Sequence, residues 1–165
     1  VPFTGKLAKY FTNVPIVLTN DANAAAIGEM IYGGARQMKD FIVITLGTGL
    51  GSGIVVDGNL VYGYDGFAGE LGHVGVKYKG RECGCGKLGC LEAYVSATGI
   101  KRTVFKLLAE RITASELRNY SFEALDPRMI SDAAEKGDKI ALEAFENIFS
   151  LPGGRAGVEF RRARR

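Results

Sequence analysis

Four potential metal ligands are confined to one 18-residue stretch of this 165-residue chain. The sequence has one histidine and three cysteines, and all of them fall in this stretch: His73, Cys83, Cys85 and Cys90. Three thiolates and an imidazole fill a tetrahedral zinc shell and leave no open position, which is typical of structural rather than catalytic zinc. The stretch therefore predicts a structural Zn²⁺ site. The alternative is a glycine-rich turn with buried thiols and an unrelated histidine.

Two carboxylates flank these ligands, with Glu70 just before His73 and Glu92 just after Cys90. Each carboxylate oxygen can accept a hydrogen bond from a hydroxyl group, so both residues suit the hydroxyls of a sugar. One ring nitrogen of His73 would bind the metal, and the other side of the ring could face a hydroxyl. The alternative is that both glutamates are solvated at the surface.

A glycine-rich segment, Thr45–Gly53, lies between two expected strands. Its backbone N–H groups could surround a phosphate, and the Thr48 hydroxyl adds a donor. The segment lacks the Gly-Lys-Ser/Thr end of a Walker A loop. A glycine-rich hairpin turn is the alternative explanation.

Asn20 and Asp21 stand where a short apolar run gives way to an alanine-rich helical pattern. A carboxylate at a helix N-terminus is stabilised in its ionised form. In that position it could accept the proton of an attacking hydroxyl, as an aspartate does in phosphoryl transfer. The alternative is an ordinary helix-capping pair.

The elements that must position these groups alternate between strands and helices. β-branched runs indicate strands, while capping residues and terminal glycines indicate the ends of helices. We expect helices at 3–11, 21–32, 91–111 with an interruption near 98–99, 127–136 and 138–149, and strands at 16–18, 41–46, 54–56 and 60–62, with a turn at 57–59. This alternation, with a hairpin in it, favours an α/β fold.

The composition is that of an ordinary globular domain, with 47% hydrophobic and 24% charged residues. The net charge of +3 is concentrated at one end, because residues 151–165 carry +4 and leave −1 for residues 1–150. A near-neutral body argues against a nucleic-acid-binding face. The sequence contains no apolar run long enough to span a membrane. Three cysteines cannot all pair within one chain, so we expect reduced thiols and a cytoplasmic location.

Taken together, these segments resemble the ROK family of sugar kinases and repressors, and most closely its bacterial glucokinases. The matching segments are, in order, Leu18–Ala26, Leu46–Gly51, Gly69–His73 and Cys83–Glu92, and the resemblance extends over residues 1–149. It implies an actin-like, ribonuclease-H-like ATPase fold, of which this chain would form a part. It also implies ATP-dependent phosphorylation of a hexose, with glucose converted to glucose 6-phosphate.

The resemblance further implies roles for individual residues. Asp21 would be the general base on the sugar 6-hydroxyl. The sugar would be held by Asn20, Asp21, Glu70, His73 and Glu92. The phosphates of ATP, with Mg²⁺ in the complete enzyme, would lie against Gly47, Thr48, Gly49 and Gly51. Structural zinc would be bound by His73, Cys83, Cys85 and Cys90. The expected partners are a hexose and ATP, with no membrane, and with no nucleic acid unless the full-length protein carries an upstream helix-turn-helix.

The family kinases also have an N-terminal Asp-x-Gly-Gly-Thr phosphate motif and a C-terminal glycine-rich adenosine segment, and neither occurs in this sequence. We therefore expect a central fragment that is inactive alone. Residues 1–36 would end a small N-terminal domain, residues 37–150 would begin a large C-terminal domain, and residues 151–165 would be a non-core or foreign tail. The complete protein is expected to be a homo-oligomer. The rival hypothesis is a sugar-sensing repressor of the same family, with a DNA-binding helix-turn-helix upstream of Val1.

Overall fold

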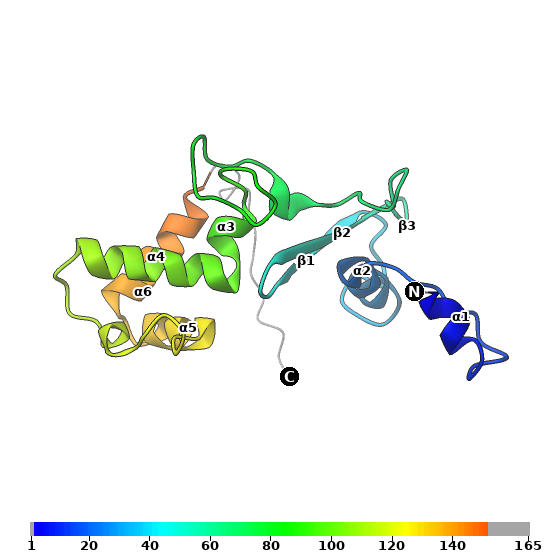
Figure 1. Ribbon diagram of the computed structural model, residues 1–165, viewed down its shortest axis with the longest axis horizontal. Helices are drawn as coiled ribbons and strands as arrows, with labels where there is room; N and C mark the ends of the chain where they lie inside the picture. Colours follow the sequence, from blue (N-terminus) through cyan, green and yellow to red (C-terminus); the bar gives the residue numbers. More distant parts are fainter. Residues whose placement is uncertain (1, 152–165) are drawn as a thin grey trace. The chain divides into compact units, whose positions relative to one another are not determined.

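The computed structural model describes residues 2–151, so nearly all of the expected tail lies outside the described residues. Its internal contacts divide the chain into two units (Figure 1). The first holds the chain up to Ile44 together with Gly51–Gly69, and the second holds Thr45–Leu50 together with the chain from Glu70 onward. The domain boundary after residue 36 is a different division and stays a prediction. Residues 45–50, in the glycine-rich segment, therefore belong to the same unit as the predicted metal ligands.

Two helices and most of a small sheet form the first unit. The helices are α1 (Phe3–Leu7) and α2 (Asp21–Ile31), and the strands are β1 (Phe41–Leu46), β2 (Leu50–Val56) and β3 (Asn59–Leu60). The strands lie in the order β1-β2-β3. The predicted helix at 21–32 and the predicted strand at 41–46 are both present, whereas β2 extends back into the glycine-rich segment.

The β2–β3 hairpin forms where the sequence predicts a turn. Val55 pairs with Leu60 and Val56 pairs with Asn59, which leaves a two-residue turn at 57–58. Both turn residues have positive φ angles, 50° and 74°. This is the conformation of a type I′ turn, whose twist matches that of the strands it joins.

Helix α2 lies directly on β2. Its buried face is formed mostly by alanines, including Ala22 and Ala26. A Cβ atom added at Gly53 of β2 would come within 2.6 Å of the Ala26 Cβ and 2.7 Å of the Ala22 carbonyl oxygen. Because only a glycine permits this close approach, the helix is seated tightly on the sheet. The N-terminus of α2 is thereby fixed within the first unit.

The strand predicted at 16–18 is wrong in this structure, since these residues have no regular secondary structure. Val17 is 82% exposed and Leu18 is 65% exposed. A strand needs a neighbouring strand to pair its N–H and C=O groups. Within residues 2–151, the sheet contains only β1, β2 and β3, and none of them pairs with this segment.

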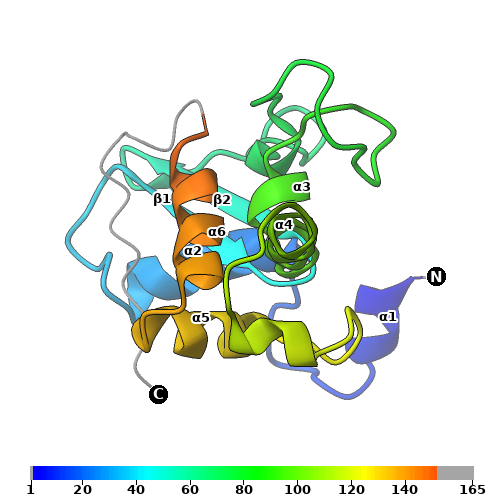
Figure 2. The same ribbon diagram turned by 90° about the vertical axis from the view of Figure 1, so that its left-hand side faces the viewer.

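Packed helices form the main core of the second unit. The short helix η1 (Leu71–His73) comes first, followed by α3 (Glu92–Val95), α4 (Ala97–Glu110), η2 (Glu116–Asn119), α5 (Pro127–Glu135) and α6 (Lys139–Phe149). Figure 2 shows α6 beside α4, with α5 below both. The most deeply buried large side chains are Val104, Leu117, Leu125, Ile130 and Ile140. Each contributes about 1.5–3 kcal/mol by leaving water, so this core provides a firm support for α3.

Each long helix of the second unit begins at a side-chain cap. Ser96 caps α4, Asp126 caps α5 and Asp138 caps α6, each through an oxygen that accepts a backbone N–H hydrogen bond. Capping of this kind is readable from sequence, and the observed ends of α5 and α6 agree with the predicted ends within one residue. The interruption predicted near 98–99 occurs at Ser96, where the chain leaves α3 and is capped again.

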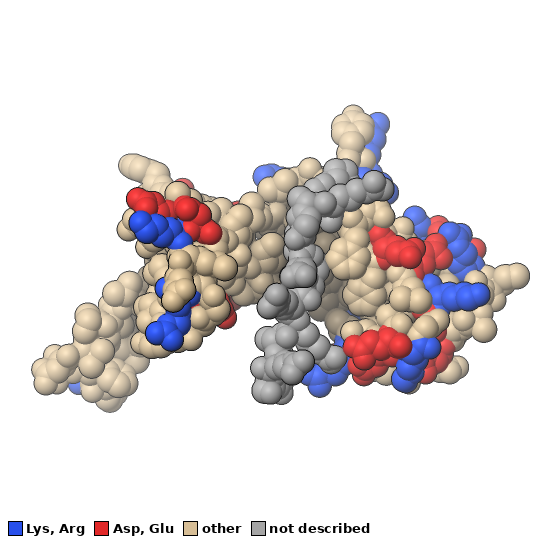
Figure 3. Space-filling view, turned by 180° about the vertical axis from the view of Figure 1, so that it is seen from behind, with Lys and Arg blue, Asp and Glu red and all other residues tan. Residues whose placement is uncertain are grey.

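Charges of both signs are mixed over the helices on the face shown in Figure 3. Oppositely charged side chains pair along and between helices, as in Lys106–Glu110 at 3.7 Å and Arg111–Glu143 at 2.8 Å. Within residues 2–151, no helix combines the length and the apolar composition needed to cross a bilayer.

Candidate functional site

The predicted metal ligands lie on a narrow loop, residues 73–91, which we call the metal loop. Two isolated antiparallel bridges close it, Gly75 with Cys90 and Glu82 with Leu88. The Leu91 N–H also donates to the Val74 carbonyl oxygen over 2.9 Å, where the two ends of the loop meet. Backbone hydrogen bonds therefore bring residues far apart along the loop to one place.

The four predicted ligands converge. The Sγ atoms of Cys83, Cys85 and Cys90 and a ring nitrogen of His73 all lie within 4.8 Å of one another. Cys83 Sγ is 3.6 Å from His73 Nδ1, and Cys85 Sγ is 3.7 Å from Cys90 Sγ. In a tetrahedral site with Zn–S bonds of about 2.3 Å, the sulfur atoms stand about 3.8 Å apart. The spacing and the donor chemistry thus fit zinc.

The three thiols are free, and two of them, Cys85 and Cys90, differ in how readily they lose a proton. Burial raises the pKa of Cys90 to about 11. A hydrogen bond from the Lys87 backbone lowers the pKa of Cys85. Because zinc binds the thiolate form, loading the site at neutral pH must release the Cys90 proton. Metal binding must consequently weaken as the pH falls.

The two ring nitrogens of His73 face different groups. Nδ1 faces Cys83 Sγ, while Nε2 lies 4.0 Å from Glu70 Oε2. A carboxylate beside the second nitrogen of a metal-binding histidine fixes its tautomer and its ring orientation. The side chains of His73 and Glu70 are 32% and 49% exposed, so a ligand hydroxyl can reach both. Glu70 and His73 are therefore brought together as predicted.

Glu92, the first residue of α3, connects the metal loop to the turn between β1 and β2. Its Oε2 accepts a hydrogen bond from the Leu50 N–H over 2.9 Å, and Cys83 Sγ lies 3.7 Å from its Oε1. One carboxylate thus touches both parts of the site. The sequence contains no local signal for the role of Leu50, because its contribution is a backbone N–H group 42 positions away from Glu92.

The turn between β1 and β2, which we call the glycine turn, consists of Gly47, Thr48 and Gly49. The Gly47 N–H donates to the Gly49 carbonyl over 3.0 Å, and the Ala97 N–H donates to the Gly47 carbonyl over 2.9 Å. Thr48 is exposed, so its hydroxyl is free to meet a phosphate. Gly51 lies in β2 rather than in the turn, and its predicted phosphate contact stays a prediction.

We expect a single methyl group at Gly49 to disturb this arrangement. A Cβ atom there would lie 2.5 Å from Glu92 Oε2, so the carboxylate would have to leave the buried Leu50 N–H. Gly49→Ala should therefore lower the free energy of unfolding of the zinc-loaded chain by about 1–3 kcal/mol, measured by urea denaturation. Gly47→Ala is the matched control, because a Cβ there would meet nothing within 4 Å. Equal effects of the two variants would contradict the described contact.

Asn20 and Asp21 lie at the N-terminus of α2 in the first unit. Asn20 Oδ1 and Asp21 Oδ1 each accept a hydrogen bond from the Ala22 N–H over 2.8 Å. The capping interpretation is thus correct for Asn20, and it leaves the Asp21 carboxylate exposed at the positive end of the helix. Glu70, His73 and Glu92 belong to the second unit, so the joining of these residues with Asp21 in one site stays a prediction.

Comparisons with known proteins agree with this arrangement of motifs. The ROK family model matches residues 1–154. A glucokinase of Halalkalibacterium halodurans is 41% identical over 139 residues, which cover 83% of this chain and 42% of the relative. A xylose repressor of Caldicellulosiruptor bescii is 34% identical over 141 residues, which cover 86% of this chain and 35% of the relative.

Among solved structures, one similar protein is a ROK family glucokinase from Streptomyces griseus, crystallised in complex with glucose and AMPPNP. The TM-score is 0.76 at 37% identity, over 89% of this chain and 48% of that chain. The chain thus spans less than half the length of the curated relatives it matches. The predicted fold class is confirmed: the chain forms part of an actin-like ATPase fold. By this match over almost its whole length, the chain belongs to the ROK family.

Proposed function

We propose that the complete protein transfers the γ-phosphate of ATP to the 6-hydroxyl group of a hexose, with glucose as the first candidate. The observation that supports this most directly is the hydrogen bond from the Leu50 N–H to Glu92. It joins a carboxylate suited to sugar hydroxyls with a glycine turn suited to phosphates. A sugar kinase needs an acceptor and a phosphate donor to be held side by side.

In this proposal Asp21 accepts the proton of the 6-hydroxyl group. The hydroxyl oxygen bonds to the γ-phosphorus, the bond from that phosphorus to the bridging β–γ oxygen breaks, and ADP leaves. Asp21 lies in the first turn of α2, where the helix dipole favours a negative charge, and phosphoryl transfer depends more on positioning than on strong basicity. Sugar hydroxyls would be held by Asn20, Glu70, His73 and Glu92. The phosphates of ATP would lie against the glycine turn, Gly47, Thr48 and Gly49, and against Gly51 at the start of β2, with Mg²⁺ present in the complete enzyme.

The zinc ion would have a structural role. The four proposed ligands complete its shell and leave no position for substrate, so its contribution when bound is to stabilise the metal loop. Within that loop Nδ1 of His73 lies 3.6 Å from Cys83 Sγ. Glu92 lies just after the loop, two positions beyond the last ligand, Cys90. Zinc would thereby set the positions of two sugar-binding groups.

Two relatives support this proposal in different ways. The similar Streptomyces griseus protein is a glucokinase whose complex contains glucose and AMPPNP, an ATP analogue. The curated Halalkalibacterium halodurans relative is likewise a glucokinase. The three reduced thiols are also appropriate for a cytoplasmic protein. We include a cytoplasmic location and a homo-oligomeric complete protein in the proposal.

A sugar-sensing repressor is the second candidate, and the similarity to a xylose repressor favours it. A repressor of this kind would bind sugar without needing a general base, and it would bind operator DNA through a module outside these 165 residues. Asp21 distinguishes the two functions, because a sensor gains nothing from a base beside the 6-hydroxyl group.

The test is a set of parallel assays of the complete protein with ATP and several hexoses, including glucose, mannose and N-acetylmannosamine. The proposal predicts ATP-dependent phosphorylation of at least one hexose, with the highest kcat/KM for glucose. Hexose binding without phosphorylation, together with sugar-dependent binding to the DNA upstream of its own gene, would establish the repressor instead. The 165-residue chain assayed alone tests the expectation that it is inactive.

A further inference from the structure

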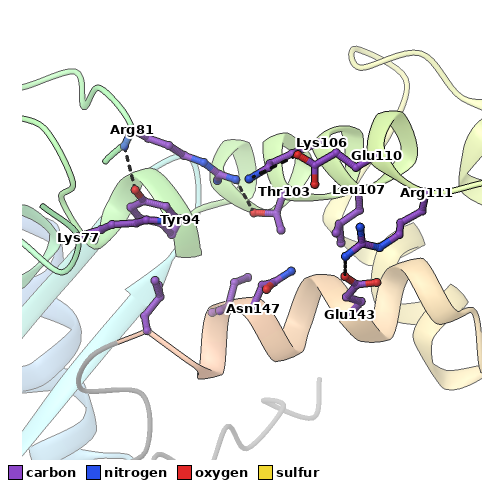
Figure 4. A pocket seen from close by; sticks show the side chains of 12 residues that line it. Lys77, Arg81, Tyr94, Thr103, Lys106, Leu107, Glu110, Arg111, Glu143 and Asn147 are labelled. Atoms are coloured by element: carbon purple, nitrogen blue, oxygen red, sulfur yellow. Dashed lines mark hydrogen bonds and ion pairs between the residues drawn. The ribbon is translucent and has the colours of Figure 1, made fainter. Parts of the chain in front are cut away.

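Arg81 of the metal loop makes four hydrogen bonds to α3 and α4, and no sugar-binding or metal-binding role explains them. Its backbone N–H donates to Tyr94 Oη over 2.8 Å. Its Nη1 donates to the carbonyl oxygens of Ala93 at 3.2 Å and Gly99 at 2.9 Å, and its Nη2 donates to Thr103 Oγ1 at 2.9 Å. Figure 4 shows the side chain extending from the loop toward Thr103.

These partners lie on two different helices. Ala93 and Tyr94 belong to α3, while Gly99 and Thr103 belong to the first turns of α4. The guanidinium carbon also lies 4.8 Å from the centre of the Tyr94 ring, in a cation–π arrangement. Arg81 therefore attaches the junction between α3 and α4 to the metal loop. It also lines a pocket of about 280 Å³.

The bonded groups make this contact specific for arginine. The last carbonyl oxygens of a helix have no partner within the helix, and Arg81 satisfies that of Ala93 in α3. Only a guanidinium has several donors in a rigid plane, whereas a lysine ammonium is a compact point charge. Burial, followed by the nearby Arg102, lowers the pKa of Arg81, but a guanidinium keeps its charge at neutral pH.

The junction between α3 and α4, which Arg81 contacts, lies close to Glu92 of the proposed site. Glu92 is the first residue of α3, immediately before Ala93 and two before Tyr94. The Leu50 N–H orients one end of its carboxylate. The position of its backbone depends on the contacts that hold α3 in place. The metal loop contributes Cys83, two positions after Arg81, to the same place.

We propose that Arg81 is a positioning residue, which fixes α3 to the metal loop and thereby places the Glu92 carboxylate for a sugar hydroxyl. This inference rests on the proposed function. In this role Arg81 acts through α3 rather than by contact with the sugar or the metal. Its removal should weaken sugar binding while leaving the four metal ligands in place.

The test compares Arg81→Lys with the control Arg102→Lys in the complete protein. Arg102 also links α4 to the metal loop, through its Nη1 and the Glu82 carbonyl at 3.4 Å, but it has no hydrogen bond to α3. We expect Arg81→Lys to raise the KM and the dissociation constant for glucose about tenfold or more, since small displacements of positioning groups have effects of this size. The KM for ATP should change by less than about twofold in Arg81→Lys. In Arg102→Lys, the KM and the dissociation constant for glucose should also change by less than about twofold.

Zinc content and the absorption spectrum of the Co²⁺-substituted protein separate positioning from general damage. We expect one metal per chain and an unchanged Co²⁺–thiolate spectrum in Arg81→Lys. Thr103→Val, which removes one acceptor of the guanidinium, should raise the dissociation constant for glucose in the same direction by a smaller factor. It also keeps the inference testable should Arg81→Lys fail to fold.

The inference would be overturned if metal-loaded Arg81→Lys bound glucose with a dissociation constant within twofold of the wild-type value. If Arg81→Lys does not fold, the same result for Thr103→Val would overturn it. A wild-type protein that binds glucose without phosphorylating it would overturn only the kinase function, and calorimetry would still test Arg81. A wild-type protein that binds no hexose at all would overturn both.

Discussion

Replacing Asp21 with asparagine should lower kcat for hexose phosphorylation by about 10² to 10⁴-fold, the usual contribution of a general base. The amide cannot take up the proton of the 6-hydroxyl group, whereas it keeps the size and the helix-capping ability of the carboxylate. Asp21 also accepts a backbone hydrogen bond through Oδ1, which asparagine can reproduce. The dissociation constant for glucose should therefore change by less than about threefold. Steady-state kinetics and calorimetry measure the two quantities.

Asp126→Asn is the matched control for this substitution. Asp126 caps α5 through Oδ1, as Asn20 caps α2 through its own Oδ1. Asparagine is as good a cap as aspartate, so kcat and stability should both stay near their wild-type values. Unchanged turnover in Asp21→Asn would show that another group is the base, whereas lost glucose binding would show that the substitution acts on the sugar rather than on proton transfer.

Removing the metal should have the second large effect. The apolar cluster around the metal loop is small, with Cys83, Cys90, Ala93 and Tyr94 as its buried members. The loop therefore depends on its ligands, as in other structural zinc sites. Treatment with a chelator should lower the thermal unfolding temperature and weaken glucose binding about 100-fold or more, since His73 and Glu92 lose their fixed positions. Emission spectrometry, thermal unfolding and calorimetry follow the three changes.

The control for chelation is recovery of binding. Adding Zn²⁺ back should restore both the unfolding temperature and glucose affinity, while Mg²⁺ should restore neither, because thiolates select zinc over hard cations. Cys90→Ser should behave like the chelated protein and should not recover. Full glucose affinity in protein shown to be metal-free would contradict the structural role given to the site.

Features that depend on neighbouring residues could be predicted from the sequence. Asn20 precedes the helix expected at 21–32 and caps α2, and Asp138 begins the helix expected at 138–149 and caps α6. The metal ligands also lie within one short loop, so their convergence follows from local backbone bonding. Four such local segments carry the resemblance to the ROK family, which the match of the family model to residues 1–154 confirms.

Features that depend on distant residues could not be predicted. The strand expected at 16–18 has the right composition, but no described strand pairs with it. The hydrogen bond between the Leu50 N–H and Glu92 involves a main-chain group that is the same in every residue type except proline. Arg81 looks like any surface arginine in the sequence, and the role proposed for it rests on its four hydrogen bonds to α3 and α4.

The central claim is that phosphate is transferred to the 6-hydroxyl group of a hexose, and 6-deoxyglucose tests it most directly. This sugar keeps the hydroxyls that Glu70, His73 and Glu92 would bind but lacks the oxygen that would attack ATP. In assays of the complete protein with ATP, we predict glucose 6-phosphate from glucose, no phosphorylated product from 6-deoxyglucose, and competitive inhibition of the glucose reaction by 6-deoxyglucose. A phosphorylated 6-deoxyglucose, or no product from glucose or any other hexose, would contradict the account.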